Sequence, residues 1–455
     1  MMNSVRLFFR NFIKYFLYIA VFAQLVSGTV YLICHFTECT SAPETQELLN
    51  VAETLVFDEY VSILYPLFLK LCLFIEETTG VFYYVSVYLM QIMTFAVALW
   101  YVTGNFFQGK KKFLVCAFVL ANPMCLSTML SVSPYAFKTV LGLVIVGAMM
   151  KLWQGTGKLY HFLMIFVSYL LSTLNERGDL YVWFVPIAVF VSVILLKKQK
   201  NIKIYKKMGI LLALFFVFAV SFGVGKSISD VGARGRMQKT VSSVLFQRTL
   251  WPDMAVKYNF MPSQLRAVVH IDIAMSSDSS AEQMQYVIGP LVETAYGLEV
   301  ADNLYMEAVK NQFSYNKKAI FKAVTGDFLG YALTPYSTMS YITGQEGAAF
   351  GKLYSLMSVS YPHMVYTYYC ISFVALFLLT MAALLKAVKE KVVVQKEKMK
   401  KILFFAAIIL YQALWYAIVN VQGVDYRYVL LNVVLFSLFA VSGILEMDCI
   451  ERNAK

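Results

Sequence analysis

Long apolar stretches separated by short polar segments dominate the pattern along the chain. About 20 apolar residues in a helix are needed to cross the hydrocarbon core of a bilayer. Ten stretches reach or approach that length, and we expect a transmembrane helix in each: 12–34, 81–103, 113–130, 135–152, 159–174, 180–196, 208–224, 364–385, 402–420 and 428–445. The pattern predicts an all-α fold, a polytopic transmembrane helical bundle of about ten spans.

Helical patterns also occur in two regions outside these stretches, 36–80 and 225–363. Residues 60–75 are apolar but too short to span, so they predict an interfacial or re-entrant helix in the first outer loop, 36–80. Apolar residues recur at helical spacing in 237–258, 281–296, 299–313 and 317–331, with a break expected at Pro252 and a capping box formed by Ser279 and Glu282. These helices predict an extracytoplasmic helical domain, 225–363, between transmembrane regions 1–224 and 364–455.

Charge determines the orientation that we expect. The chain is 59% hydrophobic and only 15% charged, whereas soluble domains carry roughly 25% charged residues. Its net charge of +12 is concentrated in short lysine and arginine clusters at 6–14, 110–112, 151–158, 197–207 and 386–401, each beside an apolar stretch. Because cytoplasmic loops are enriched in these residues, both termini are predicted to be cytoplasmic in a multi-pass cell-membrane protein. This pattern indicates topology and not binding to nucleic acid.

An acidic pair in the first outer loop is the first candidate for catalysis. Asp58 and Glu59 precede Tyr60 and the short apolar helix. A partly desolvated carboxylate at a membrane surface binds a proton more readily and can act as a general base on a hydroxyl group. The alternative is a solvated pair, or a helix cap with no catalytic role.

A charged turn lies between two predicted spans. Glu176, Arg177 and Asp179 occupy a very short segment close to hydrocarbon, where ionisable groups are costly and often functional. The guanidinium of Arg177 is suited to bidentate binding of a phosphate. A local ion pair within an ordinary interfacial turn is the alternative.

A second short turn precedes the last predicted span. Arg427 is a candidate anion ligand there, beside Asp425 and Tyr426. The tyrosines of this turn could line a sugar site, although an interfacial aromatic belt explains them equally well.

Two further basic residues lie on the predicted outer side. Lys138 opens the fourth span, where it could extend outward to solvent or contact a phosphate. Arg248 belongs to a basic segment that could approach lipid phosphate or rest on headgroups. The 4 histidines and 7 cysteines show no metal-binding spacing, so we predict no metal site and no cofactor; a divalent cation is not indicated.

With this topology, the chain resembles the GT-C superfamily of membrane glycosyltransferases, particularly bacterial relatives of the protein mannosyltransferases and the aminoarabinose transferase. The resemblance lies in the acidic pair Asp58-Glu59, in the segment 63–68, in the turn around Arg177 and in the segment 425–428. Two features depart from the family. Tyr65-Pro66 stands where a His-Pro-Pro type of motif is common, and the outer domain is helical.

The resemblance implies an inverting transfer of a sugar from a polyprenyl-phosphate donor to an acceptor glycan, lipid or protein on the extracytoplasmic face. Asp58 or Glu59 would be the general base. Cations beside the departing phosphate would stabilise the transition state. The implied phosphate-binding residues are Arg177, Arg427, Lys138 and Arg248, and the implied substrate-lining residues are Tyr60, Tyr65, Glu176, Asp179, Asp425 and Tyr426.

Two other functions remain open. A cell-envelope polysaccharide polymerase or flippase-like protein would also use outer arginines, but would not require the acidic pair. A transporter is disfavoured, because its charged residues usually lie at midplane depth, whereas here they gather at the outer ends of the spans.

Overall fold

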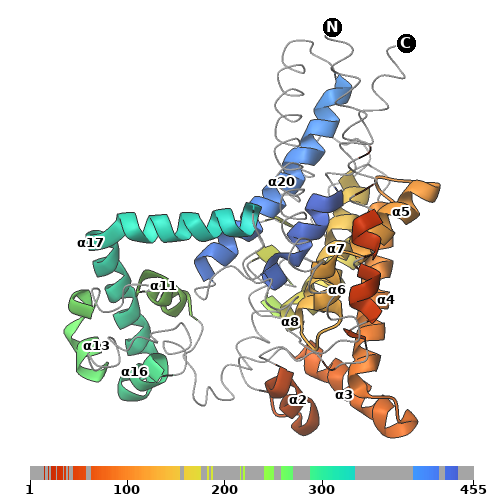
Figure 1. Ribbon diagram of the computed structural model, residues 1–455. Coiled ribbons are helices and arrows are strands. Elements are labelled where there is room, and N and C mark those ends of the chain that lie inside the picture. The colour runs from red at the N-terminus through yellow and green to blue at the C-terminus, as the bar shows by residue number, and fades with distance from the viewer. Residues whose placement is uncertain are drawn as a thin grey trace. The chain divides into compact units, whose positions relative to one another are not determined.

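The fold is seen in a computed structural model of the 455-residue chain (Figure 1). The structure describes residues 15, 19, 22–26, 28–33, 35–36, 39, 45–57, 63–153, 158–175, 182–183, 186–187, 216, 219–220, 240–250, 258–269, 287–333, 393–419 and 426–438. For residues 123, 250, 316, 333, 393–405 and 426 it describes the backbone alone. Within these ranges the chain forms helices and no β-strand, which confirms the all-α prediction.

The chain divides into two compact units. The first comprises residues 1–224, 338–405 and 430–455, and the second comprises 225–337 and 406–429. The long helix α20 (Val393–Val419) contributes residues to both units. Residues 426–438 continue from the 3-10 helix η3 (Tyr426–Val429) into a helix.

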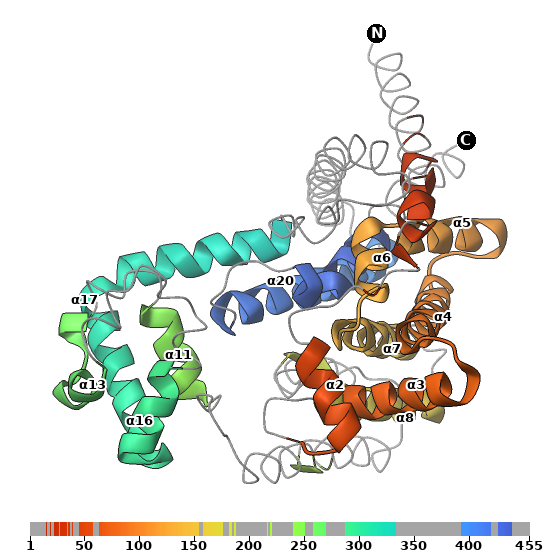
Figure 2. The same ribbon diagram turned by 60° about the horizontal axis from the view of Figure 1, so that its bottom comes forward.

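Seven helices form the described part of the first unit: α2 (Thr45–Thr54), α3 (Leu64–Thr79), α4 (Tyr83–Thr103), α5 (Gly109–Leu120), α6 (Pro123–Met129), α7 (Tyr135–Trp153) and α8 (Leu159–Asn175). The helix α7 packs against both α4 and α8. Figure 2 shows α2 and α3 adjacent to each other, with α8 next to α3. Small residues allow close packing: a Cβ on Gly142 would meet Leu431 at 2.6 Å, and one on Gly147 would meet the Tyr101 ring at 2.6 Å.

Two described helices, α4 and α7, are long and apolar enough to cross a membrane. Shorter apolar helices occur at Phe22–Ile33, Leu159–Asn175, Ala406–Val419 and Arg427–Leu438. The predicted spans 180–196, 208–224 and 364–385 lie almost entirely outside the described residues. The number of spans therefore stays a prediction.

The prediction of one unbroken helix over 113–130 is wrong. The structure divides this segment into α5 and α6, because Pro123 lacks an amide hydrogen and its ring disfavours a continuing helix. Asn122 caps α6 by accepting a hydrogen bond from the amide of Met124 at 2.9 Å. At the end of α5, the Gln24 side chain donates to the Phe118 carbonyl.

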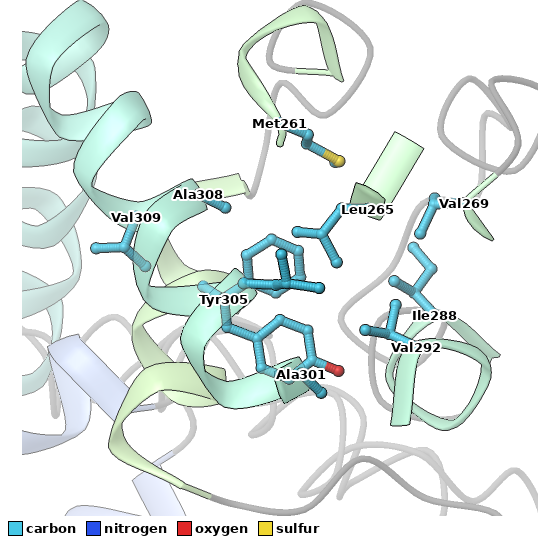
Figure 3. Close-up of a cluster of buried hydrophobic side chains, with 11 residues drawn as sticks. Met261, Leu265, Val269, Ile288, Val292, Ala301, Tyr305, Ala308 and Val309 are labelled. Carbon is cyan, nitrogen blue, oxygen red and sulfur yellow. The ribbon is translucent and has the colours of Figure 1, made fainter. Parts of the chain in front are cut away.

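Four helices surround the core of the second unit: α11 (Val241–Leu250), α13 (Ser263–Val268), α16 (Gly289–Tyr296) and α17 (Leu298–Leu333), with the short 3-10 helix η1 (Tyr258–Phe260). Figure 3 shows Leu265, Val292 and Tyr305 pointing toward one another from α13, α16 and α17. The Phe246 ring of α11 stacks on Tyr305 at a centroid distance of 4.8 Å. These contacts give the unit a hydrophobic core of its own.

The helix boundaries predicted here are only partly tested. The described part of α11 covers Val241–Leu250, and the break expected at Pro252 lies outside the described residues. The two helices predicted at 299–313 and 317–331 are instead one helix, α17, because no residue between them interrupts the backbone hydrogen bonds. Figure 1 shows α17 as two limbs joined by a bend. The predicted capping box, Ser279 with Glu282, lies outside the described residues.

Candidate functional site

A buried side-chain amide near the centre of α4 forms hydrogen bonds to several parts of the first unit. Gln91 is fully buried, and its Oε1 accepts a hydrogen bond from the Tyr65 hydroxyl at 3.0 Å. Its Nε2 donates to the carbonyls of Met129 and Ser131, both at 2.9 Å. Both amide hydrogens and the amide oxygen are thus paired, as a buried polar group requires. Gln91 therefore ties α3 and α4 to the loop between α6 and α7.

Side chains from two more helices hold the same loop. The Thr45 hydroxyl of α2 donates to the Val132 carbonyl at 2.9 Å. The Asn175 amide, at the end of α8, donates to the Pro134 carbonyl at 3.0 Å, and the backbone amide of Lys138 donates to the same carbonyl at 3.1 Å. We call residues 129–138, which form this loop and the first turn of α7, the junction loop.

Two polar groups at the junction loop are buried in an unusual way. Lys138 is only 7% exposed, with its Nζ 5.9 Å from the centroid of the Tyr135 ring. Asn175 is 1% exposed, and its Oδ1 has no hydrogen-bond partner in the described part of the chain. Burial of a charge and of an unpaired acceptor is costly, and such positions are frequently functional.

A backbone hydrogen bond joins the start of α3 to the end of α8. The Ile63 amide donates to the Leu174 carbonyl at 2.9 Å. Ile63 follows the predicted motif 57–60 closely along the chain, and Leu174 immediately precedes the charged turn 175–179. The described residues that flank these two motifs are therefore adjacent.

Most of the predicted site residues lie outside the described residues. These are Asp58, Glu59, Tyr60, Glu176, Arg177, Asp179, Asp425 and the side chain of Tyr426. Tyr65, predicted to line a substrate, is fully buried, and its ring lies 5.6 Å from that of Phe137 by centroids. Its hydroxyl is bonded to Gln91 in this structure.

The two described arginines of the prediction belong to the second unit. Arg248 is 3% exposed, and its Nη2 lies 2.7 Å from Oδ2 of Asp327. Arg427 is half-buried in η3, next to Tyr428, whose ring lies 5.2 Å from that of Tyr416. The structure thus gives Arg248 a carboxylate partner, which any anionic ligand would have to replace.

Other groups of the described residues offer no sign of catalysis. No three histidine, cysteine, aspartate or glutamate side chains gather there as metal ligands. Burial raises the pKa of the Cys72 thiol to about 12, so this cysteine stays protonated near neutral pH.

Gln91 and Asn175 were not among the predicted site residues. Gln91 is the one carboxamide in the otherwise largely apolar helix α4, and that isolation was a usable signal. Asn175 immediately precedes Glu176 of the charged turn, and no role was predicted for it. Nothing local in the sequence indicated that its amide would reach the loop between α6 and α7.

Comparisons of the chain with protein-family models, with curated proteins and with solved structures found no match.

Proposed function

We propose that this protein is a membrane glycosyltransferase of the GT-C type, which transfers a sugar from a polyprenyl-phosphate donor to an acceptor on the extracytoplasmic face of the cell membrane. The proposal includes about ten spans and cytoplasmic termini. The observation that supports it best is the hydrogen bond between Ile63 and Leu174. It joins the segments that continue into the acidic pair and into the arginine turn.

Chain length limits how far the two motifs can lie from this hydrogen bond. One residue of extended chain covers at most about 3.6 Å. Arg177 lies three residues after Leu174, and Asp58 lies five residues before Ile63. Arg177 can therefore lie at most about 11 Å from Leu174, and Asp58 at most about 18 Å from Ile63. The buried Lys138 lies in the junction loop, to which Asn175 bonds. These limits are compatible with a base and two cations in one region, which the proposed reaction requires.

The chemistry follows from these groups. Asp58 or Glu59 accepts the proton of an acceptor hydroxyl, whose oxygen attacks the anomeric carbon of the sugar. The bond between that carbon and the phosphate oxygen breaks, and the configuration inverts. Negative charge grows on the departing lipid phosphate, where Arg177 and Lys138 stabilise it more strongly than in the ground state.

The test uses purified full-length protein in lipid nanodiscs, supplied with a panel of synthetic polyprenyl-phosphate monosaccharides. Released polyprenyl phosphate is measured by mass spectrometry. We expect release with at least one donor, and a loss of about 100-fold or more in Asp58→Asn or Glu59→Gln. The matched control is Glu53→Gln, which neutralises an exposed carboxylate on α2 and should leave the rate unchanged.

Three results would contradict the proposal. The first is full activity in both neutral variants. The second is a requirement for a lipid-linked oligosaccharide donor, which favours a polysaccharide polymerase. The third is a cysteine at position 314 that a membrane-impermeant reagent labels only from the cytoplasmic side, because this would reverse the predicted topology.

A further inference from the structure

Helix α17 has an exposed face that combines lysines with aromatic rings. Lys310, Lys317 and Phe321 are exposed and lie seven, then four residues apart, which places them in one stripe along the helix. Lys318 and Lys322 flank this stripe on one side and Phe313 on the other, all of them exposed. Phe321 is 73% exposed and Phe313 is 51% exposed. We call these six residues the basic–aromatic face.

The charge on this face is not neutralised locally. Between Glu307 and Asp327 the sequence contains no carboxylate. Asp327 is itself paired with the buried Arg248. None of the four lysines takes part in an ion pair with another described residue. The face therefore presents four positive charges that a partner could neutralise.

The opposite side of the helix helps to explain why this face is outward. Ala301, Tyr305 and Ala308 lie on the side of α17 opposite Lys310 and pack into the hydrophobic core. The Tyr315 ring is held against Phe260 at a centroid distance of 3.8 Å. The helix is thus anchored by one side, and the position of the basic–aromatic face follows from that anchoring.

We infer that the basic–aromatic face binds the surface of a bilayer that contains anionic lipid. Aromatic rings on a helix enter the boundary between headgroups and acyl chains, and lysines bind the negative headgroups around them. Each lysine near such a surface favours contact by about fivefold. The inference requires a membrane protein, but it does not depend on any glycosyl transfer.

The experiment places a nitroxide on a cysteine at position 314, which lies within the stripe and is exposed. The full chain is assembled in nanodiscs of phosphatidylcholine, with or without phosphatidylglycerol, and the unsubstituted chain is labelled in parallel as background. Electron paramagnetic resonance power saturation compares contact with oxygen, which concentrates in lipid, and with a water-soluble nickel complex. We expect lipid contact only when phosphatidylglycerol is present.

Variants separate this surface from general effects of charge. Replacing Lys310, Lys317, Lys318 and Lys322 by glutamine should weaken lipid contact by several hundredfold, from about fivefold for each lysine. The control variant, Lys110→Gln with Lys111→Gln, removes two exposed lysines of α5 and should leave contact unchanged.

Each other outcome overturns the inference. A label that stays in water in both bilayers means that the face does not bind lipid. Equal lipid contact without phosphatidylglycerol means that the aromatic rings alone insert. If soluble polyphosphate lowers contact of the label with the nickel complex and phosphatidylglycerol has no effect, the partner is a soluble polyanion.

Discussion

The hydrogen bonds of Gln91 to Tyr65 and to the junction loop allow the effect of their removal on the free energy of unfolding to be predicted. In Gln91→Leu, three buried groups lose their hydrogen bond to Gln91: the Tyr65 hydroxyl and the carbonyls of Met129 and Ser131. At about 1 kcal/mol for each group, the free energy of unfolding should fall by about 3 kcal/mol. Tyr65→Phe alone leaves only the Gln91 oxygen unpaired, for about 1 kcal/mol.

The double variant distinguishes a direct bond from general damage to the core. When both side chains are apolar, only the two carbonyls remain unpaired, so the loss should be about 2 kcal/mol, which is less than for Gln91→Leu alone. The coupling energy is then about 2 kcal/mol. Hydrogen bonds in membrane proteins often couple by less, about 0.6 kcal/mol on average, so a value near 1 kcal/mol would still agree in sign.

The assay is unfolding by sodium dodecyl sulfate in mixed micelles, followed by circular dichroism for the four proteins of the cycle. Near-ultraviolet spectra of the folded variants show whether the aromatic packing around Tyr65 is retained. Losses that simply add in the double variant would refute the argument, because additivity means that the two side chains do not interact in the folded protein.

Three further predictions concern other parts of the chain. Asp327→Asn should destabilise the second unit by about 3 kcal/mol in chemical denaturation, because it leaves the buried Arg248 without its counter-charge; an unchanged midpoint would contradict this. Burial, and then the negative charges of nearby carboxylates, raise the pKa of the Tyr305 phenol above its ordinary value of 10.0. The contribution of Tyr305 to the free energy of unfolding is therefore fully present below about pH 10 and is lost as the pH rises above that value. Tyr305→Phe should flatten that decline in a pH series of unfolding curves. Gly147→Ala should cost about 1–3 kcal/mol through contact with the Tyr101 ring, whereas Gly326→Ala, which meets nothing within 4 Å, should stabilise α17 by up to about 1 kcal/mol; equal effects on thermal unfolding would refute the packing argument.

At the candidate site, the sequence pattern predicted a helix but not the contacts between distant residues. The helix after the acidic pair was predicted at 60–75 and is observed as α3, because a short apolar run bounded by polar residues is a local signal. The bonds of Gln91 to the junction loop were not predicted, since they join residues 26 to 40 positions apart. No periodicity in the sequence encodes such a distance.

The amino-acid sequence alone determined the helical class of the described residues and the positions of α4, α7 and α8, because apolar runs and their polar boundaries act over a few helical turns. Only the tertiary structure decided that Ile63 would bond to Leu174, that Asn175 would be buried at the junction loop and that Arg248 would pair with Asp327. These contacts depend on how whole helices pack, and packing is set by many side chains together.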